Sequence, residues 1–275
     1  MDSAEIAALF DDRAPRYARD RWHQRYAQAF VAALPLRPGE VALDAGTGTG
    51  FAAAAIARKV APGGRVLAVD LSAGMLDQAR AVMAAAGVNN VDFLQADATN
   101  LPALGSATFD AVACSAGLLY MPVADALREW RRLARPGGLV AFSTMQCDSP
   151  SAGRLFRRCA RELGLDVQDK SEALGTIDRC TKALRDAGLE VVDVIPAHVE
   201  FEVMDPAAAW EANLRSIGHS AARALPPERQ QELRRRYLDA LQRAMEEDLA
   251  SAARADVLFA LGTPSLAARA SAKLT

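Results

Sequence analysis

Apolar and amphipathic segments alternate along the chain from Glu40 onward. Each short apolar run is followed by a segment whose apolar residues recur at helical spacing, until the rhythm changes after Thr144. This alternation is typical of βαβ units that build a parallel sheet. Five strands are therefore predicted, at EVALDAG, RVLAVDL, VDFLQAD, FDAVACSAGLLY and LVAFST.

Turn and capping residues mark where these segments begin and end. Ser72 is a natural N-cap and Gly87 a natural C-terminal stop for the helix SAGMLDQARAVMAAAG. The stretch RPGG, residues 135–138, predicts a turn that leads into the fifth strand.

Helical segments dominate after Thr144. SAGRLFRRCARELG and IDRCTKALRDAG are predicted helices, and LEVVDVIPAHVEFEV is a long strand region that we expect to be bent or interrupted at Pro196. ADVLFALG is the last predicted strand. The insertion between these two strands has an apolar helical stripe, which indicates core packing or a cap over a pocket: Leu233, Tyr237, Leu241 and Met245.

These segments predict an α/β core with two helical additions. The expected parts are an N-terminal helical lid (1–39), the core (40–204), a helical cap insertion (205–254) and the last core strand with a tail (255–275).

Charge and cysteine content exclude several classes of protein. Lysine and arginine number 32 against 34 acidic residues, so the net charge of -2 favours neither nucleic acid nor an anionic membrane as a partner. The four cysteines and three histidines have no metal-ligand spacing, and no apolar stretch is long enough to span a bilayer. We expect a soluble, cytoplasmic protein without a metal, as a monomer or homodimer.

A glycine-rich loop joins the first predicted strand to its helix. Gly46, Gly48 and Gly50 let a ligand approach the backbone, and the following helix offers unpaired N–H groups. A dinucleotide fingerprint would place a small residue where this chain has Phe51, so a nicotinamide cofactor fits poorly.

Carboxylates follow three of the predicted strands. Asp44 precedes the glycine loop, where it would repel a pyrophosphate but attract an ammonium group. Asp70 ends the second strand, where a carboxylate can bind both hydroxyls of a ribose, and Asp97 follows the third, where it can accept a hydrogen bond from an exocyclic amine. The set suits an adenosine with a zwitterionic tail and no phosphates.

LDAGTGTG, VLAVDLSAGML, FLQADATNLP, FDAVACSAGLLYMP and LREWRRLARPGGLVAFS resemble, in this order, the motifs of class I S-adenosylmethionine-dependent methyltransferases. The resemblance is greatest to the small-molecule group that includes the quinone-biosynthesis enzymes, and it extends from Phe10 to Thr144. It implies a Rossmann-like seven-stranded sheet, mostly parallel with an antiparallel last strand beside the fifth, and helices on both faces.

The resemblance also implies a role for each matching residue. Asp44 and Gly46 would lie near the methionine amino and carboxylate groups, and Gly48 and Gly50 would give close backbone contact. The remaining cofactor-binding residues would be Asp70 at the ribose, Leu71, Met75, Asp97 and Ala98 around the adenine, Ser115 at the methionine portion and Tyr17 folded over the cofactor.

Methyl transfer from a sulfonium mainly requires alignment and exclusion of water, so few catalytic residues are expected. The candidate general bases are His23 and His219, one in each lid segment. Candidate acceptor-pocket residues are Trp22, Tyr26, Tyr120, Met145 and Trp210.

The leading hypothesis is methylation of a small, largely apolar metabolite at oxygen or carbon. The segment CSAG, residues 114–117, replaces the motif that such enzymes use on planar amino groups, and no carboxylates stand at the positions used for magnesium. Two alternatives remain open: a member of the fold that binds S-adenosylmethionine while catalysing another reaction such as cyclisation, and a nicotinamide oxidoreductase.

Overall fold

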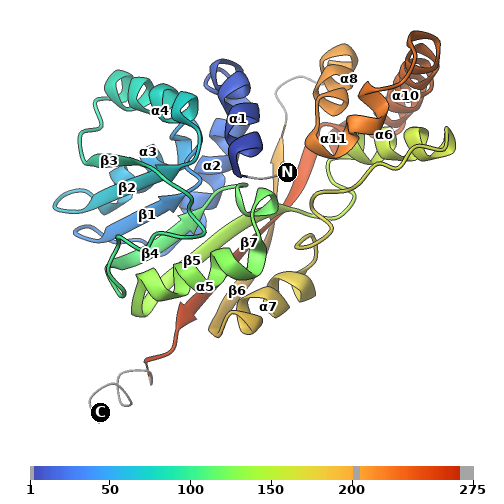
Figure 1. Ribbon diagram of the computed structural model, residues 1–275. Helices are drawn as coiled ribbons and strands as arrows, with labels where there is room; N and C mark the ends of the chain where they lie inside the picture. The colour runs from blue at the N-terminus through green and yellow to red at the C-terminus, as the bar shows by residue number, and fades with distance from the viewer. Residues whose placement is uncertain (1–2, 201–204, 267–275) are drawn as a thin grey trace. The chain divides into compact units, whose positions relative to one another are not determined.

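The computed structural model describes residues 3–200 and 205–266, and a seven-stranded sheet runs through it in the order β3-β2-β1-β4-β5-β7-β6 (Figure 1). The strands β1 to β5 are parallel neighbours, and the antiparallel β7 lies between β5 and β6. The expected fold class and the place of the last strand are therefore confirmed. The strands are β1 (Val41–Ala45), β2 (Arg65–Asp70), β3 (Val91–Gln95), β4 (Phe109–Cys114), β5 (Ala134–Met145), β6 (Leu189–Glu200) and β7 (Arg254–Pro264).

The fourth and fifth strands differ from the prediction in their bounds. β4 ends at Cys114, and the apolar residues after it form the short 3₁₀ helix η1 (Leu118–Tyr120). β5 already begins at Ala134, so the predicted turn at RPGG is wrong. Ala134 pairs with Phe109 and Leu139 with Ala111, so that four residues of β5, 135–138, lie opposite the single residue Asp110 of β4. The RPGG stretch is thus a bulge inside the strand, which Gly137 accommodates with a φ of 75°.

Pro196 does not interrupt β6, which runs without a break from Leu189 to Glu200. The strand is the outermost of the sheet, and an edge strand has backbone positions that need no donor, so a proline is tolerated there. The end of the predicted strand, residues 201–204, lies outside the described residues.

The chain divides into two units, of which the first comprises residues 1–144, 177–195 and 259–275. In this unit α2 packs against α3 and α1 against α4, while α5 packs against α7. Ser72 caps α4 at its start and Gly87 ends it in a left-handed conformation, as predicted. The helices are α1 (Ser3–Tyr17), α2 (Arg21–Ala33), α3 (Phe51–Val60), α4 (Ala73–Ala86), α5 (Val123–Leu133) and α7 (Ile177–Asp186).

The second unit comprises residues 145–176 and 196–258 and has a hydrophobic core of its own. Leu233, Tyr237 and Leu241 of the predicted stripe are buried in this core, and Met245 packs against it. In neither unit does a described helix have the length and apolarity needed to cross a membrane. The helical segments of the second unit are α6 (Ser151–Glu162), α8 (Pro206–Leu214), η2 (Ile217–His219), α9 (Ser220–Arg223), α10 (Pro227–Glu247) and α11 (Leu249–Ala252).

Candidate functional site

The loop between β1 and α3 surrounds a buried carboxylate. Asp44 lies near the carboxyl end of the interior strand β1 and is fully buried. The Thr47 hydroxyl donates to Asp44 Oδ2 at 2.7 Å, whereas Asp44 Oδ1 is buried with no hydrogen-bond partner. A buried carboxylate oxygen without a donor is costly, so this atom is a ready acceptor for a donor on a ligand.

The electrostatics of Asp44 favour a cationic ligand. Burial raises the pKa of Asp44 to about 7, and the nearby negative charge of Asp70 adds to the rise, while the Thr47 hydroxyl opposes it. A positively charged group beside Asp44 Oδ1 would stabilise the ionised form and lower this pKa again.

Asp70 ends the neighbouring strand β2 and holds the glycine loop in place. The backbone N–H of Gly48 donates to Asp70 Oδ2 at 2.8 Å, and the backbone N–H of Ser72 donates to Oδ1 at 2.9 Å. Burial raises the pKa of Asp70, and these backbone donors oppose the rise. Each carboxylate oxygen has a second lone pair, so Asp70 retains the capacity to accept hydrogen bonds from two hydroxyls of a ligand.

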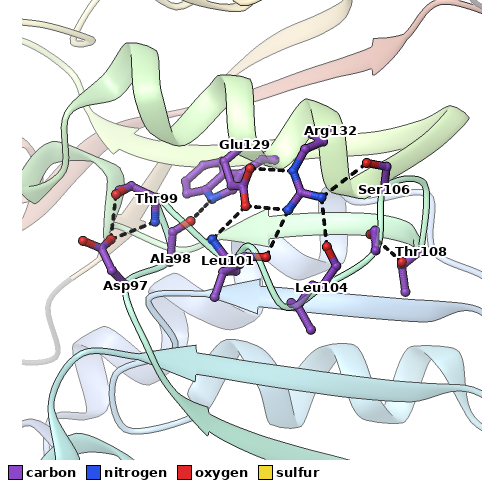
Figure 2. Close-up of polar contacts among 11 residues, drawn as sticks. Asp97, Ala98, Thr99, Leu101, Leu104, Ser106, Thr108, Glu129 and Arg132 are labelled. Atoms are coloured by element: carbon purple, nitrogen blue, oxygen red, sulfur yellow. Dashed lines mark hydrogen bonds and ion pairs between the residues drawn. The ribbon is translucent and has the colours of Figure 1, made fainter.

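Asp97 and Ala98 follow the third strand, in a segment whose backbone is held by side chains of α5 (Figure 2). The Thr99 backbone N–H and hydroxyl both donate to Asp97 Oδ1, at 2.9 and 2.7 Å. The buried indole of Trp130 donates to the Ala98 carbonyl at 2.9 Å, and the Leu101 N–H donates to Glu129 Oε1 at 2.8 Å.

Arg132 completes this support. Its guanidinium donates to the carbonyls of Leu101 and Leu104 and pairs with Glu129 (Figure 2). Helix α5 therefore fixes the backbone carbonyls of Ala98, Leu101 and Leu104. Asp97 itself follows β3 at the same edge of the sheet as Asp44 and Asp70.

The glycines of the loop serve different purposes. All three have positive φ, at 70° for Gly46, 55° for Gly48 and 83° for Gly50. A Cβ on Gly50 would lie 2.9 Å from atoms of Ala79 and Met83, so this glycine is required for the packing of α3 on α4. A Cβ on Gly48 would meet nothing within 4 Å, so open space adjoins the loop backbone there.

The N-terminal helix α1 is attached to the same edge of the sheet. Asp11 Oδ1 accepts hydrogen bonds from the Ser72 hydroxyl at 2.6 Å and from the Gly74 N–H at 2.9 Å, at the start of α4. The Ser3 hydroxyl lies 3.4 Å from Asp97 Oδ2. The helix therefore contacts the two segments that follow β2 and β3.

Aromatic side chains form a continuous group beside this helix. Tyr17 lies 6.4 Å from Phe10 between ring centroids, and Phe10 lies 5.2 Å from Tyr120 of η1. On the other side, Tyr17 lies 4.5 Å from the imidazole of His23, which adjoins Trp22 at 5.0 Å. We call Phe10, Tyr17, Trp22, His23, Tyr26 and Tyr120 the aromatic group.

The predicted site residues fall into two sets. Leu71 and Met75 stand at the start of α4, Met75 being buried, and Ser115 directly follows β4. These residues belong to the first unit together with the strand-end carboxylates, the glycine loop and the aromatic group.

Met145, Trp210 and His219 belong to the second unit. Trp210 is buried in its core beside Phe156, and the His219 ring stacks on Phe156 at 4.7 Å. His219 Nδ1 lies 2.7 Å from the carbonyl of Asn213, and burial lowers the pKa of His219.

The hydrogen-bond acceptors of the site fit an S-adenosylmethionine. The unpartnered Asp44 Oδ1 suits an ammonium group, the remaining lone pairs of Asp70 suit ribose hydroxyls, and the open space at Gly48 leaves room for a ligand against the backbone. No phosphate-binding arginine or lysine is needed for this ligand.

Sequence reasoning missed Thr47, Asp11 and Asp20. Thr47 lies within the glycine loop, and a hydroxyl three residues after a strand-end carboxylate is a signal for a local hydrogen bond. Asp11 gives no local signal, because its partners Ser72 and Gly74 are distant in sequence. Asp20 precedes a helix, where an aspartate signals an N-cap.

Comparison with known proteins agrees with this geometry. The methyltransferase domain family matches residues 42–138. A malonyl-[acyl-carrier protein] O-methyltransferase of Enterobacter lignolyticus is 38% identical over 152 residues, which are 54% of this chain and 57% of the relative. A demethylmenaquinone methyltransferase of Lactobacillus johnsonii is 30% identical over 185 residues, which are 60% of this chain and 74% of the relative.

A solved structure extends the likeness to nearly the whole chain. The complex between the Haloferax volcanii Trm112 methyltransferase activator and a methyltransferase matches with a TM-score of 0.58 and 21% identity, over 93% of this chain and 97% of that one. This match shows the fold. The chain spans only 57%, 49% and 59% of the length of three of its curated relatives.

A mostly parallel sheet with a glycine loop after the interior strand β1 and carboxylates at the ends of β1 and β2 is typical of a nucleoside-binding α/β protein. Within that class, the chain belongs to the class I S-adenosylmethionine-dependent methyltransferases of small-molecule type.

Proposed function

We propose that this protein binds S-adenosylmethionine and transfers its methyl group to an oxygen or carbon atom of a small, largely apolar acceptor. The observation that carries the proposal is Asp44 Oδ1, a buried carboxylate oxygen without a partner beside the glycine loop. Asp70 and Asp97 support it, because they stand at the carboxyl ends of the adjacent strands β2 and β3, the edge of a parallel sheet where nucleosides bind.

The residues of the chain act by binding, orienting and excluding water. Asp44 would hold the ammonium group, Asp70 the ribose hydroxyls, and Asp97 with the backbone at Ala98 the amino edge of the base. When bound, S-adenosylmethionine supplies a methyl group already activated by its sulfonium. The aromatic group would line the acceptor side and keep water away from the reacting atoms.

Calorimetric titration with S-adenosylmethionine and S-adenosylhomocysteine tests the cofactor half of the proposal. We expect wild type to bind both, and Asp44→Asn to bind about 10–100-fold more weakly, because a charge-assisted buried hydrogen bond is lost. Asp92→Asn, on an exposed position of β3, is the matched control and should bind like wild type. Unchanged binding by Asp44→Asn, or binding of NADH in place of these ligands, would contradict the proposal.

Transfer itself is tested with a methyl-labelled cofactor and a panel of hydroxylated and enolisable small molecules. Label in the acceptor supports methyl transfer, and the position of the label assigns oxygen or carbon. An acceptor that is converted without gaining label would instead identify a reaction such as cyclisation.

A further inference from the structure

We propose that Asp20 and His23 form a general-base pair for the methyl acceptor, and that this acceptor is a hydroxylated aromatic compound methylated on oxygen. The proposal rests on the methyl transfer proposed above. It adds the group that removes the proton, the residue that orients this group, and the chemical class of the acceptor.

The carboxylate of Asp20 lies close to one nitrogen of the His23 imidazole. Its Oδ2 lies 2.8 Å from His23 Nδ1, while its Oδ1 caps α2 by accepting from the backbone N–H groups of Trp22 at 2.9 Å and His23 at 3.2 Å. The imidazole beside it lowers the pKa of Asp20 against the effect of burial, so the carboxylate is ionised at neutral pH. Because Oδ1 is fixed by the helix, Oδ2 is also fixed relative to the ring.

This contact selects the tautomer of His23. An ionised carboxylate beside Nδ1 favours the form with the proton on Nδ1, so the lone pair is on Nε2. Among the described residues no partner of Nε2 is seen, and the side chain is 29% exposed. Nε2 is therefore available to take a proton from a ligand, and Asp20 would stabilise the imidazolium that results.

The surroundings of His23 favour an aromatic acceptor. Its ring packs at 4.5 Å from Tyr17, which connects through Phe10 to Tyr120 of η1. Met121, directly after Tyr120, lies against the glycine loop, since a Cβ on Gly46 would be 2.9 Å from Met121 Cε. The aromatic group thus extends from His23 to the glycine loop after β1. Aromatic rings prefer tilted and edge-to-face contacts with one another, so this group favours a ligand that is itself an aromatic ring.

The tyrosines of the group do not compete for the role of base. Burial raises the pKa of Tyr17, Tyr26 and Tyr120, so their hydroxyls stay neutral near pH 7. The titratable groups in contact with His23 are Asp20 and Tyr17, and the charge of Arg13 acts on Tyr17 and Tyr120.

A base is required because an ordinary phenol, with a pKa of about 10, is almost entirely protonated at pH 7. In the proposed step the acceptor O–H gives its proton to His23 Nε2, and the oxygen lone pair forms the new O–CH₃ bond. The C–S bond breaks, and its electron pair remains on sulfur as S-adenosylhomocysteine. The proton leaves His23 to solvent after release of the methyl ether.

The tautomer is measured first, since it needs no acceptor. Long-range ¹⁵N NMR of the histidine rings at pH 8 should show His23 with the proton on Nδ1 and an unprotonated Nε2. Asp20→Ser retains an N-capping hydroxyl for α2 but removes the carboxylate, so it should lose this tautomer preference. A wild-type His23 with its proton on Nε2 would overturn the proposal.

The catalytic role is measured with two phenols of different acidity. We expect His23→Gln to lower kcat/KM for 4-methylphenol by about 100-fold, but by less than about tenfold for a nitrophenol that is already ionised at pH 8. Asp20→Ser should reduce only the 4-methylphenol rate and shift its pH profile, and His198→Gln, on an exposed position of β6, should change neither.

The outcomes separate this proposal from the proposed function. Equal losses for both phenols, or no loss in His23→Gln, would overturn the general-base pair while methyl transfer remains. Cofactor binding without methylation of any phenol would overturn the acceptor class. Failure of folded wild type to bind S-adenosylmethionine would instead overturn the proposed function.

Discussion

The indole N–H of Trp130 donates to the backbone carbonyl of Ala98 at 2.9 Å, from a side chain that is completely buried. Helix α5 thereby fixes the backbone at Ala98, in the segment after β3 that we propose contacts the adenine. Glu129 and Arg132 of the same helix hold the residues that follow (Figure 2).

Trp130→Phe should therefore weaken both the fold and the cofactor site. Loss of the donor leaves the Ala98 carbonyl unsatisfied, which costs about 1–3 kcal/mol, and the smaller ring leaves a cavity. We expect a several-fold weaker affinity for S-adenosylhomocysteine, measured by calorimetry. Trp210→Phe, in the core of the other unit, should lower the melting temperature without changing this affinity. An equal effect of the two substitutions on affinity would contradict the role of Trp130.

The stability of the ligand-free protein should fall as the pH rises toward and through 7. The folded-state pKa of Asp44 is raised to about 7 from its ordinary value of 3.8, so the folded state binds more protons than the unfolded state between these values. The contribution of Asp44 is therefore complete below about pH 4 and is lost through pH 7, at up to about 1.4 kcal/mol per pH unit. Urea unfolding at pH 5.5, 6.5 and 7.5 measures it, and Asp44→Asn should show a smaller slope over this range.

Cofactor affinity should change with pH in the opposite direction. An ammonium group binds the ionised form of Asp44, so binding releases a proton from this carboxyl wherever it is protonated in the free protein. Between pH 5.5 and 7 we expect the dissociation constant for S-adenosylhomocysteine to fall by up to about tenfold per pH unit. Proton release, read from titrations in buffers of different ionisation enthalpy, checks the cause, and it should be absent in Asp44→Asn.

Asp11 should determine how firmly α1 is held. Asp11→Ala removes the acceptor of the Gly74 N–H and the Ser72 hydroxyl, so we expect a loss of about 1–2 kcal/mol in unfolding free energy and faster hydrogen exchange in α1. Asp12→Ala is the matched control, because Asp12 forms an exposed ion pair with Arg16. Equal exchange rates in the two variants would show that the helix is held by its apolar face alone.

Two glycines of one loop should respond differently to the same substitution. Gly48→Ala and Gly50→Ala each place a side chain at positive φ, which costs about 1–2 kcal/mol. Gly50→Ala also forces a Cβ to 2.9 Å from Ala79 and Met83, so it should unfold at clearly lower urea concentration. Gly48→Ala meets no protein atom and should instead lose cofactor affinity. The reverse pattern would contradict the division of roles.

The sequence predicted those parts of the fold that depend on local pattern. Alternation located the strands, and Ser72 and Gly87 marked the ends of α4 because capping depends on neighbours in sequence. The turn at RPGG was predicted wrongly, since glycine and proline indicate a break without showing whether the neighbouring strand continues to pair across it. Pro196 is tolerated in β6 because of the strand's place in the sheet, which local pattern does not reveal.

The residues of the candidate site likewise divide into those that local sequence pattern predicts and those that it does not. Asp44, Asp70 and Asp97 were identifiable because each stands at or just after the carboxyl end of a strand, and parallel strands bring such residues to one edge. The unpartnered oxygen of Asp44 and the attachment of Asp11 to α4 depend on distances between segments, which the sequence alone does not give.

The bulge at the start of β5 has a consequence for how this protein tolerates insertions and deletions. Between Ala134 and Leu139 the strand β5 has three residues more than the segment of β4 that it faces. Because three is an odd number, every later side chain of β5 points to the opposite face from the one that regular alternation would give it. One of these side chains is Ser143, whose hydroxyl accepts the Ala116 N–H at 3.0 Å. A change of length within the bulge can be absorbed by its loop, whereas the loss of one residue between Leu139 and Ser143 would turn the core side of the strand outward. Among related sequences, insertions and deletions should therefore occur at residues 135–138 and be absent from positions 139–143.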